Sequence, residues 1–173
     1  MIPSDHFVRF YNEVFKALEE RGHEHLVAFW RELGRLQAKE LAQRFQEGGL
    51  EACREYWEQI VKEENCLADL SLTEDYFEFR MLQCPSLSKA MDNDASPCAY
   101  YCDHCMGWIQ PVMEEAGLYV AYDMESRTDP HCVFRVYKDR RKAEAFRQQA
   151  RLPADPYDLC PPEATASKET EEP

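Results

Sequence analysis

The spacing of apolar residues changes its period near Cys66, and this change sets the fold class. Before Cys66, apolar residues recur at helical spacing through residues 4–22, 24–49 and 50–65, which predicts three amphipathic helices. After Cys66, apolar and polar residues alternate, as they do in half-buried strands. Helices followed by strands are typical of an α+β domain, in which a helical layer packs on a sheet.

Four strands are predicted in the second half of the chain, in two pairs. Residues 69–72 and 76–82 form the first alternating pair, and residues 118–122 and 132–137 form the second. Between the pairs, residues 97–117 have the pattern of a helix. We therefore expect an α+β fold with an N-terminal three-helix layer, then an antiparallel sheet of two hairpins with a central helix between them.

The end of the chain differs in composition from the rest. Residues 152–173 contain five prolines, six acidic residues and one lysine. Such a segment offers too little apolar surface to remain ordered alone. We therefore expect a single α+β domain over residues 1–151 and a flexible, acidic, proline-rich tail over 152–173.

The formal net charge of −13 limits the classes of partner. Nucleic acids and anionic membrane surfaces are held by Lys and Arg, so neither is expected as a partner. A small molecule that is neutral or cationic fits this charge better. A homodimer is compatible with the sequence, which does not fix the oligomeric state.

The first residues, Met1 to His6, lack the basic segment and apolar run of a secretory signal. No stretch approaches the roughly 18 uncharged apolar residues that span a bilayer. We therefore expect a cytoplasmic protein. In that compartment the eight cysteines are expected as thiols or metal ligands rather than structural disulfides.

The stretch that begins at Ser96 concentrates the reactive side chains. Ser96 is a good N-cap and Pro97 suits the first helical position, so a helix is predicted to begin here. On that helix Cys98, Cys102 and Cys105 would lie within an arc of roughly 60°. Three interpretations remain open: metal or thiolate chemistry, packing of the thiols in the core, and a redox disulfide.

Residues 84–137 resemble the L-2-aminothiazoline-4-carboxylate hydrolase-like family, which is related to small-molecule-binding domains of the 4-vinyl reductase type. The resemblance rests on Cys84-Pro85 after a strand, on an aromatic residue followed by Cys102-Asp103, and on the segment 129–135, Asp-Pro-His-Cys-Val-Phe-Arg. Family members commonly show a Gly-Asp-x-x-Cys-x-Phe pattern there, and Thr128 stands where its Gly is expected. Cys98 and Cys105 also depart from the family pattern.

The resemblance implies an α+β domain with a pocket for a small organic molecule and, in the hydrolase, a metal-dependent ring opening. On this basis Cys84, Cys102 and Cys132 are the expected metal ligands, with Cys105 or Asp103 as the fourth. The expected ion is divalent, with zinc preferred and manganese as the alternative.

Three functional hypotheses follow. The first is a metal-dependent enzyme acting on a small heterocycle that contains sulfur or nitrogen, or on a related acid, with Asp103 or His131 as general base. The second is a non-catalytic small-molecule sensor with a structural metal site, since a site closed by four thiolates leaves no open position. The third is disulfide exchange between Cys102 and Cys105.

A pocket is expected between the central helix and the sheet, because α+β layers leave a gap where helix and sheet diverge. Asp103, His104 and His131 are its expected polar groups. The thiols of the four proposed ligands are predicted to converge there, because the helix that carries two of them must pack on the sheet that the other two border. The expected lining is aromatic: Tyr101, Trp108, Phe79 and Tyr122.

Overall fold

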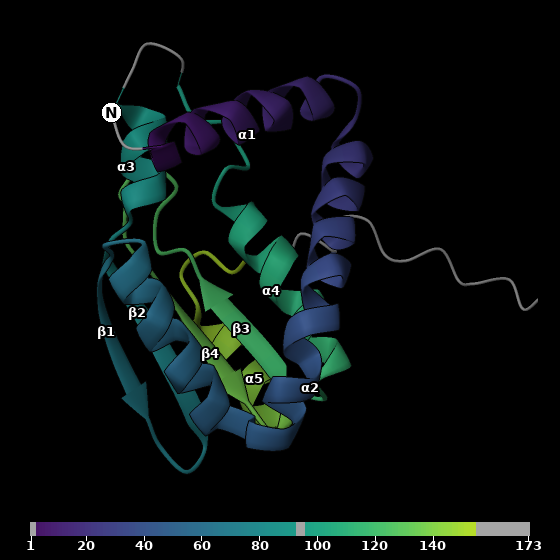
Figure 1. Cartoon of the computed structure of the whole chain (residues 1–173), viewed down its shortest axis with the longest axis vertical. Coiled ribbons are helices and arrows are strands. Elements are labelled where there is room, and N and C mark those ends of the chain that lie inside the picture. Colours follow the sequence, from purple (N-terminus) through teal and green to yellow (C-terminus); the bar gives the residue numbers. More distant parts are fainter. Residues whose placement is uncertain (1–2, 93–95, 155–173) are drawn as a thin grey trace, which may run out of the picture.

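The computed structural model describes residues 3–92 and 96–154. Over these ranges the chain forms five helices and four strands (Figure 1). In chain order they are α1 (Pro3–Glu19), α2 (His23–Glu63), β1 (Leu67–Leu72), β2 (Tyr76–Gln83), α3 (Pro85–Met91), α4 (Asp103–Glu115), β3 (Tyr119–Asp123), β4 (Cys132–Tyr137) and α5 (Arg140–Gln149).

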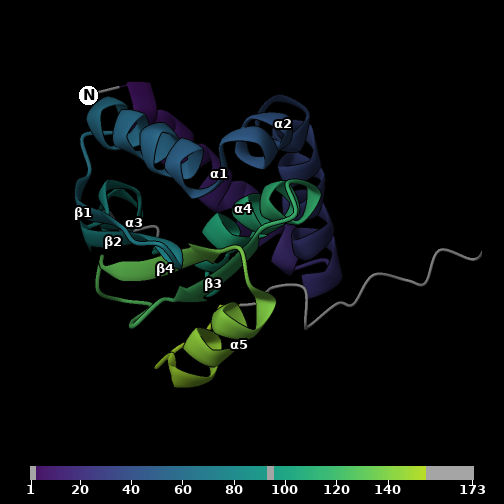
Figure 2. The same ribbon diagram turned by 90° about the horizontal axis from the view of Figure 1, so that it is seen from below.

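The four strands form one antiparallel sheet in the order β1-β2-β4-β3. β1 pairs with β2 and β3 pairs with β4, as the two predicted hairpins require, and β2 and β4 join the hairpins at the centre. Figure 2 shows α1, α2 and α4 over one face of the sheet and α5 against the other. The predicted α+β class is confirmed, and long N-terminal helices pack on the sheet.

The N-terminal layer contains two helices where three were predicted. α2 runs through both the second and the third predicted helices and turns sharply at Gly49, whose backbone has φ +59° and ψ −140°. A side chain is rarely tolerated at such a φ, so glycine permits the turn. The Gly48-Gly49 pair therefore redirects the helix instead of ending it.

The central helix, α4, begins at Asp103 and not at Pro97 as predicted. Ser96 has a φ of +57°, which is not the geometry of an N-cap. The reason lies in α1, where the Asn12 amide donates to the Ser96 carbonyl at 3.0 Å and accepts from the Cys98 N–H at 2.9 Å. Cys98 is consequently buried beside α1 and does not share a helical face with Cys102 and Cys105.

Two glycines bring α4 close to α2. A Cβ at Gly107 would lie 2.8 Å from the Trp30 Cβ, and a Cβ at Gly34 would lie 2.7 Å from the Pro111 Cγ. Pro111 lies inside α4, which continues through it to Glu115. The close approach fixes the position of α4 against α2. In the described ranges, no helix combines the length and the apolar character needed to cross a bilayer.

The last described residues pack against β3. The Met124 N–H donates to the Leu152 carbonyl at 2.9 Å, and the Ala154 N–H donates to the Tyr122 carbonyl at 3.3 Å. Of the tail predicted from residue 152, only residues 152–154 fall within the described ranges, and these three are docked on the sheet. The remainder lies outside the described residues.

The Asp123 carboxylate secures this docking. It is buried and accepts hydrogen bonds from the backbone N–H groups of Glu125, Arg151 and Leu152, each at 2.9 Å. Burial alone would raise the pKa of Asp123, but the three N–H donors bring it below its usual value. The ionised form of Asp123 is therefore favoured more strongly in the folded protein than in the unfolded chain.

We expect Asp123→Ala to lower the free energy of unfolding by about 1–3 kcal/mol at pH 7, because three backbone donors lose their acceptor. A depressed pKa means that this stabilisation is complete above the unfolded pKa of about 3.9 and is lost as the pH falls through the lower folded pKa. Urea unfolding at pH 7 and at pH 3 measures the effect. Asp69→Ala, at an exposed carboxylate of β1, is the control. Equal stabilities of wild type and Asp123→Ala at pH 7 would contradict the assignment.

Candidate functional site

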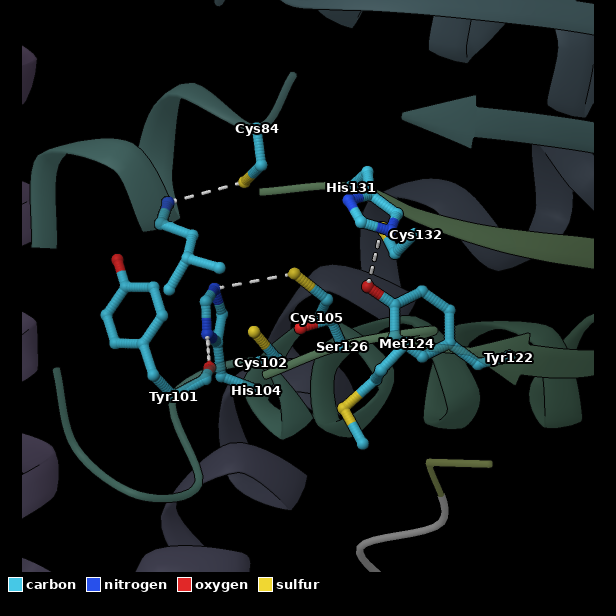
Figure 3. Close-up of a pocket in the computed structure, with 11 residues that line it drawn as sticks. Cys84, Tyr101, Cys102, His104, Cys105, Tyr122, Met124, Ser126, His131 and Cys132 are labelled. Atoms are coloured by element: carbon cyan, nitrogen blue, oxygen red, sulfur yellow. Dashed lines mark hydrogen bonds between the residues drawn. The ribbon is translucent and has the colours of Figure 1, made fainter. Parts of the chain in front are cut away.

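Beneath the β3–β4 loop lies a small, sulfur-rich cavity, which we call the cysteine cavity (Figure 3). Its volume is about 20 Å³. A buried water needs roughly 10–15 Å³ by this measure, so the space suits one water or one ion and not an organic molecule. Its walls are Cys84, Leu87, Tyr101, Cys102, His104, Cys105, Tyr122, Met124, Ser126, His131 and Cys132.

The four cysteines predicted as ligands all line this cavity, although they come from distant parts of the chain. Cys84 is the N-cap of α3, directly after β2. Cys102 and Cys105 lie at the start of α4, and Cys132 is the first residue of β4. The antiparallel register places Cys132 opposite Met81, near the end of β2. The thiol of Cys132 therefore lies at the same end of the sheet as Cys84.

Three of the four sulfurs have a defined polar neighbour. The Leu87 N–H donates to Cys84 Sγ at 3.3 Å, and the Tyr122 hydroxyl donates to Cys132 Sγ at 3.1 Å. His104 Nε2 lies 3.5 Å from Cys105 Sγ. These contacts hold the thiols in place and direct donors at two of the sulfurs.

The contacts of His104 fix its tautomer. Its Nδ1 bonds to the Tyr101 carbonyl, which can only accept, so Nδ1 carries the proton. Nε2 then presents its lone pair to Cys105, whose S–H is the donor of that contact. Burial lowers the pKa of His104 to about 4, which keeps the ring neutral at physiological pH.

Burial also keeps the thiols protonated. Burial raises the pKa of Cys84 and of Cys105 to about 11 and the pKa of Cys102 to about 12, and it also raises the pKa of Cys132. Neighbouring sulfurs raise the pKa further at Cys84, Cys102 and Cys132. Thiolates are the reactive form in disulfide exchange, so this environment does not favour exchange between Cys102 and Cys105. A cation in the cavity would reverse the balance, because it stabilises the deprotonated sulfur.

Asp103, one of the two predicted general bases, does not line the cavity. Its buried carboxylate receives a bidentate pair of hydrogen bonds from Arg127, one of them at 3.2 Å. Arg127 also donates to the Ala99 carbonyl at 3.3 Å and lies over the Tyr100 ring. The ion pair ties the β3–β4 loop to the start of α4, so Asp103 positions the walls of the cavity.

His131, the other predicted base, does line the cavity. Its Nε2 lies 3.7 Å from Glu125 Oε2, and its side chain is 40% exposed. Tyr101, His104 and Tyr122, which were predicted to line a pocket for a small molecule, also line this small cavity. Phe79 does not, because it is buried in the sheet core and stacks on Phe134 with ring centroids 5.2 Å apart.

A second and larger space, which we call the apolar pocket, opens between the helices and the C-terminal end of β2. It has a volume of about 500 Å³. Trp108, predicted for the pocket, lines it together with residues that the sequence did not single out, notably aromatic side chains of α1 and α2. Its walls are Phe7, Val8, Tyr11, Gln37, Leu41, Phe45, Tyr56, Trp57, Ile60, Glu64, Cys66, Met81, Cys84, Pro85, Ser86, His104, Cys105, Trp108, Ile109, Val112 and Met113.

The apolar pocket and the cysteine cavity share one wall. Cys84, His104 and Cys105 line both spaces. The pocket walls include one carboxylate, Glu64, and no Lys or Arg among the residues that the structure describes. The two spaces are therefore adjacent, and these two thiols and the imidazole form the floor of the apolar pocket.

Across residues 3–92 and 96–154, no group of three or more His, Cys, Asp or Glu side chains is arranged as a metal site. Comparisons of the chain with protein-family models, with curated proteins and with solved structures found no match.

Proposed function

We propose that this chain is a small-molecule-binding domain whose apolar pocket takes a flat, uncharged ligand. The observation that carries the proposal is the pocket itself, about 500 Å³ in volume and walled by the aromatic side chains of three helices. Ligand sites in proteins are typically about 300–1,000 Å³, mostly apolar, with a few placed polar groups. The rings of Tyr11, Tyr56, Trp57 and Trp108 suit a planar molecule.

The charge of the walls favours an uncharged ligand over an acid. A carboxylate entering the pocket would meet Glu64 and no basic side chain among the described walls, and moving it out of water without a partner is costly. The hydrolase hypothesis receives less support for the same reason. In addition, the Asp103 carboxylate is engaged by Arg127 and does not reach either space.

The same proposal places a zinc ion in the cysteine cavity, held by Cys84, Cys102, Cys105 and Cys132. The donor set suits zinc, since four soft sulfurs line a space of ionic size. Hydrogen bonds from the Leu87 N–H and the Tyr122 hydroxyl to two sulfurs are of the kind that support metal thiolates. Because these thiols are not arranged as a metal site in this structure, zinc binding would require them to close on the ion and to release protons. Such a closed site would pin α4 to both hairpins and stabilise the floor of the apolar pocket.

Filling the apolar pocket should abolish ligand binding. With naphthalene as the probe at about ten times its Kd, the expected stabilisation is about 1.4 kcal/mol, which corresponds to a rise of roughly 3–6 °C in the thermal midpoint. Ile60→Trp places a larger side chain in the pocket and should remove this rise.

Leu36→Trp is the matched control, because Leu36 lies on the same helix but is 48% exposed. It should retain the response to naphthalene. If naphthalene fails to stabilise wild type, or stabilises Ile60→Trp as much as wild type, the pocket is not the binding site that we propose.

A further inference from the structure

Three hydroxyl groups, from α1, from α3 and from the segment before α4, form a hydrogen-bonded chain beside the shared wall. The Tyr11 hydroxyl of α1 lies 2.9 Å from Ser86 Oγ of α3, and Ser86 Oγ lies 2.7 Å from the hydroxyl of Tyr101, which precedes α4. Tyr11 and Ser86 line the apolar pocket, and Tyr101 lines the cysteine cavity. The residues of the chain therefore border both spaces.

The protons of this chain can be counted. Three hydroxyls carry three O–H protons, and the two hydrogen bonds between them use two. The third O–H can point to the other tyrosine hydroxyl, because Tyr11 and Tyr101 also interact with each other, or to an acceptor outside the chain. A ligand atom at the pocket end can be that acceptor. A buried donor without a partner is costly.

The hydroxyl at the pocket end is held in place by aromatic contacts. The Tyr11 ring stacks on Tyr101 with centroids 6.0 Å apart and meets the edge of Trp108 at 6.0 Å. Ser86 is fixed between the two tyrosine hydroxyls. The polar corner is therefore rigid and borders an otherwise aromatic wall, the arrangement by which pockets orient their ligands.

We propose that Tyr11 and Ser86 determine the specificity of the pocket by donating one hydrogen bond to an acceptor atom on the ligand. The inference rests on the proposed function and names the ligand class more closely: a flat, uncharged aromatic molecule with a ring nitrogen or a carbonyl oxygen at one edge. Tyr101 completes the chain from the side of the cysteine cavity.

Quinoline and naphthalene test this inference, because they have nearly the same shape and differ in one ring nitrogen. Water solvates that nitrogen, so the informative quantity is the ratio of the two dissociation constants, compared between variants. Tyr11→Phe combined with Ser86→Ala removes the hydroxyls of the two chain residues that line the pocket. We expect this double variant to weaken quinoline binding by ~10-fold relative to naphthalene, the effect of leaving a desolvated acceptor unpaired.

Tyr56→Phe is the matched control, since Tyr56 lines the same pocket and takes no part in the chain. Its ratio should equal that of wild type. A ratio that is unchanged in the double variant would overturn the inference, while naphthalene binding would leave the proposed function standing. Failure of wild type to bind either probe would instead remove the proposed function.

A measurement on wild type alone covers the case in which the double variant does not fold. The ¹⁵N chemical shift of bound, labelled quinoline should stay near its hydrogen-bonded value in water. A shift toward the value in hydrocarbon solvent would mean that no hydroxyl reaches the ligand, and would overturn the inference.

Discussion

Gly34→Val is expected to lower the free energy of unfolding by about 3 kcal/mol, at the upper end of the effects of overpacking. A Cβ at this position would lie 2.7 Å from the Pro111 Cγ and 3.0 Å from the Trp108 carbonyl oxygen. Neither neighbour is the end of a flexible side chain, so α2 and α4 would have to separate. Because α4 carries Cys105 and Trp108 and directly follows Cys102, both spaces would be disturbed as well.

Chemical denaturation of wild type and Gly34→Val measures the effect. Leu36→Ala, two residues along the same helix and at a side chain that is 48% exposed, should change stability by no more than about 0.5 kcal/mol. A Gly34→Val variant as stable as wild type would mean that the two helices are not in the close contact described above.

Combining Cys105→Ser with Cys132→Ser is expected to reduce bound zinc from about one ion per chain to almost none. Two of the four proposed ligands would be replaced by hydroxyls, which remain protonated and are poor zinc donors. Elemental analysis of purified protein after dialysis is the direct measurement. Cys66→Ser is the matched control, because Cys66 lines the apolar pocket and not the cysteine cavity.

The zinc proposal also predicts how the affinity for zinc changes with pH. Burial raises the pKa of the four thiols, so each must release a proton when the ion binds, and the affinity for zinc should fall as the pH falls. Wild-type protein that retains no zinc under any of these conditions would assign the cysteine cavity to packing of neutral thiols.

The sequence predicts the fold class because the period of its apolar residues differs so clearly between the two halves. It does not predict where the helices bend or begin. A glycine pair that bends a helix, as at Gly49, looks the same in a sequence as a glycine pair that ends one. At Ser96, the local signals for a helix start are overruled by Asn12, which lies 84 residues earlier and takes up the backbone groups of that segment.

The candidate site was predictable only in part. The four cysteines could be brought together from the expected layout, because each flanks a strand or lies at the start of the central helix. The apolar pocket could not, since an apolar helical face looks the same in sequence whether it meets a core or a cavity. The pairing of Asp103 with Arg127 depends on the path of the β3–β4 loop, which no spacing rule gives.

The docking of residues 152–154 on β3 also affects how this protein meets other copies of itself. An outermost strand normally presents a row of free backbone groups, onto which the strand of another chain can add. Here Leu152 and Ala154 bond to the backbone at the end of β3, and Pro153 between them has no N–H to offer. With Asp123 holding the segment in place, the end of β3 is covered and is not open to the strand of another chain.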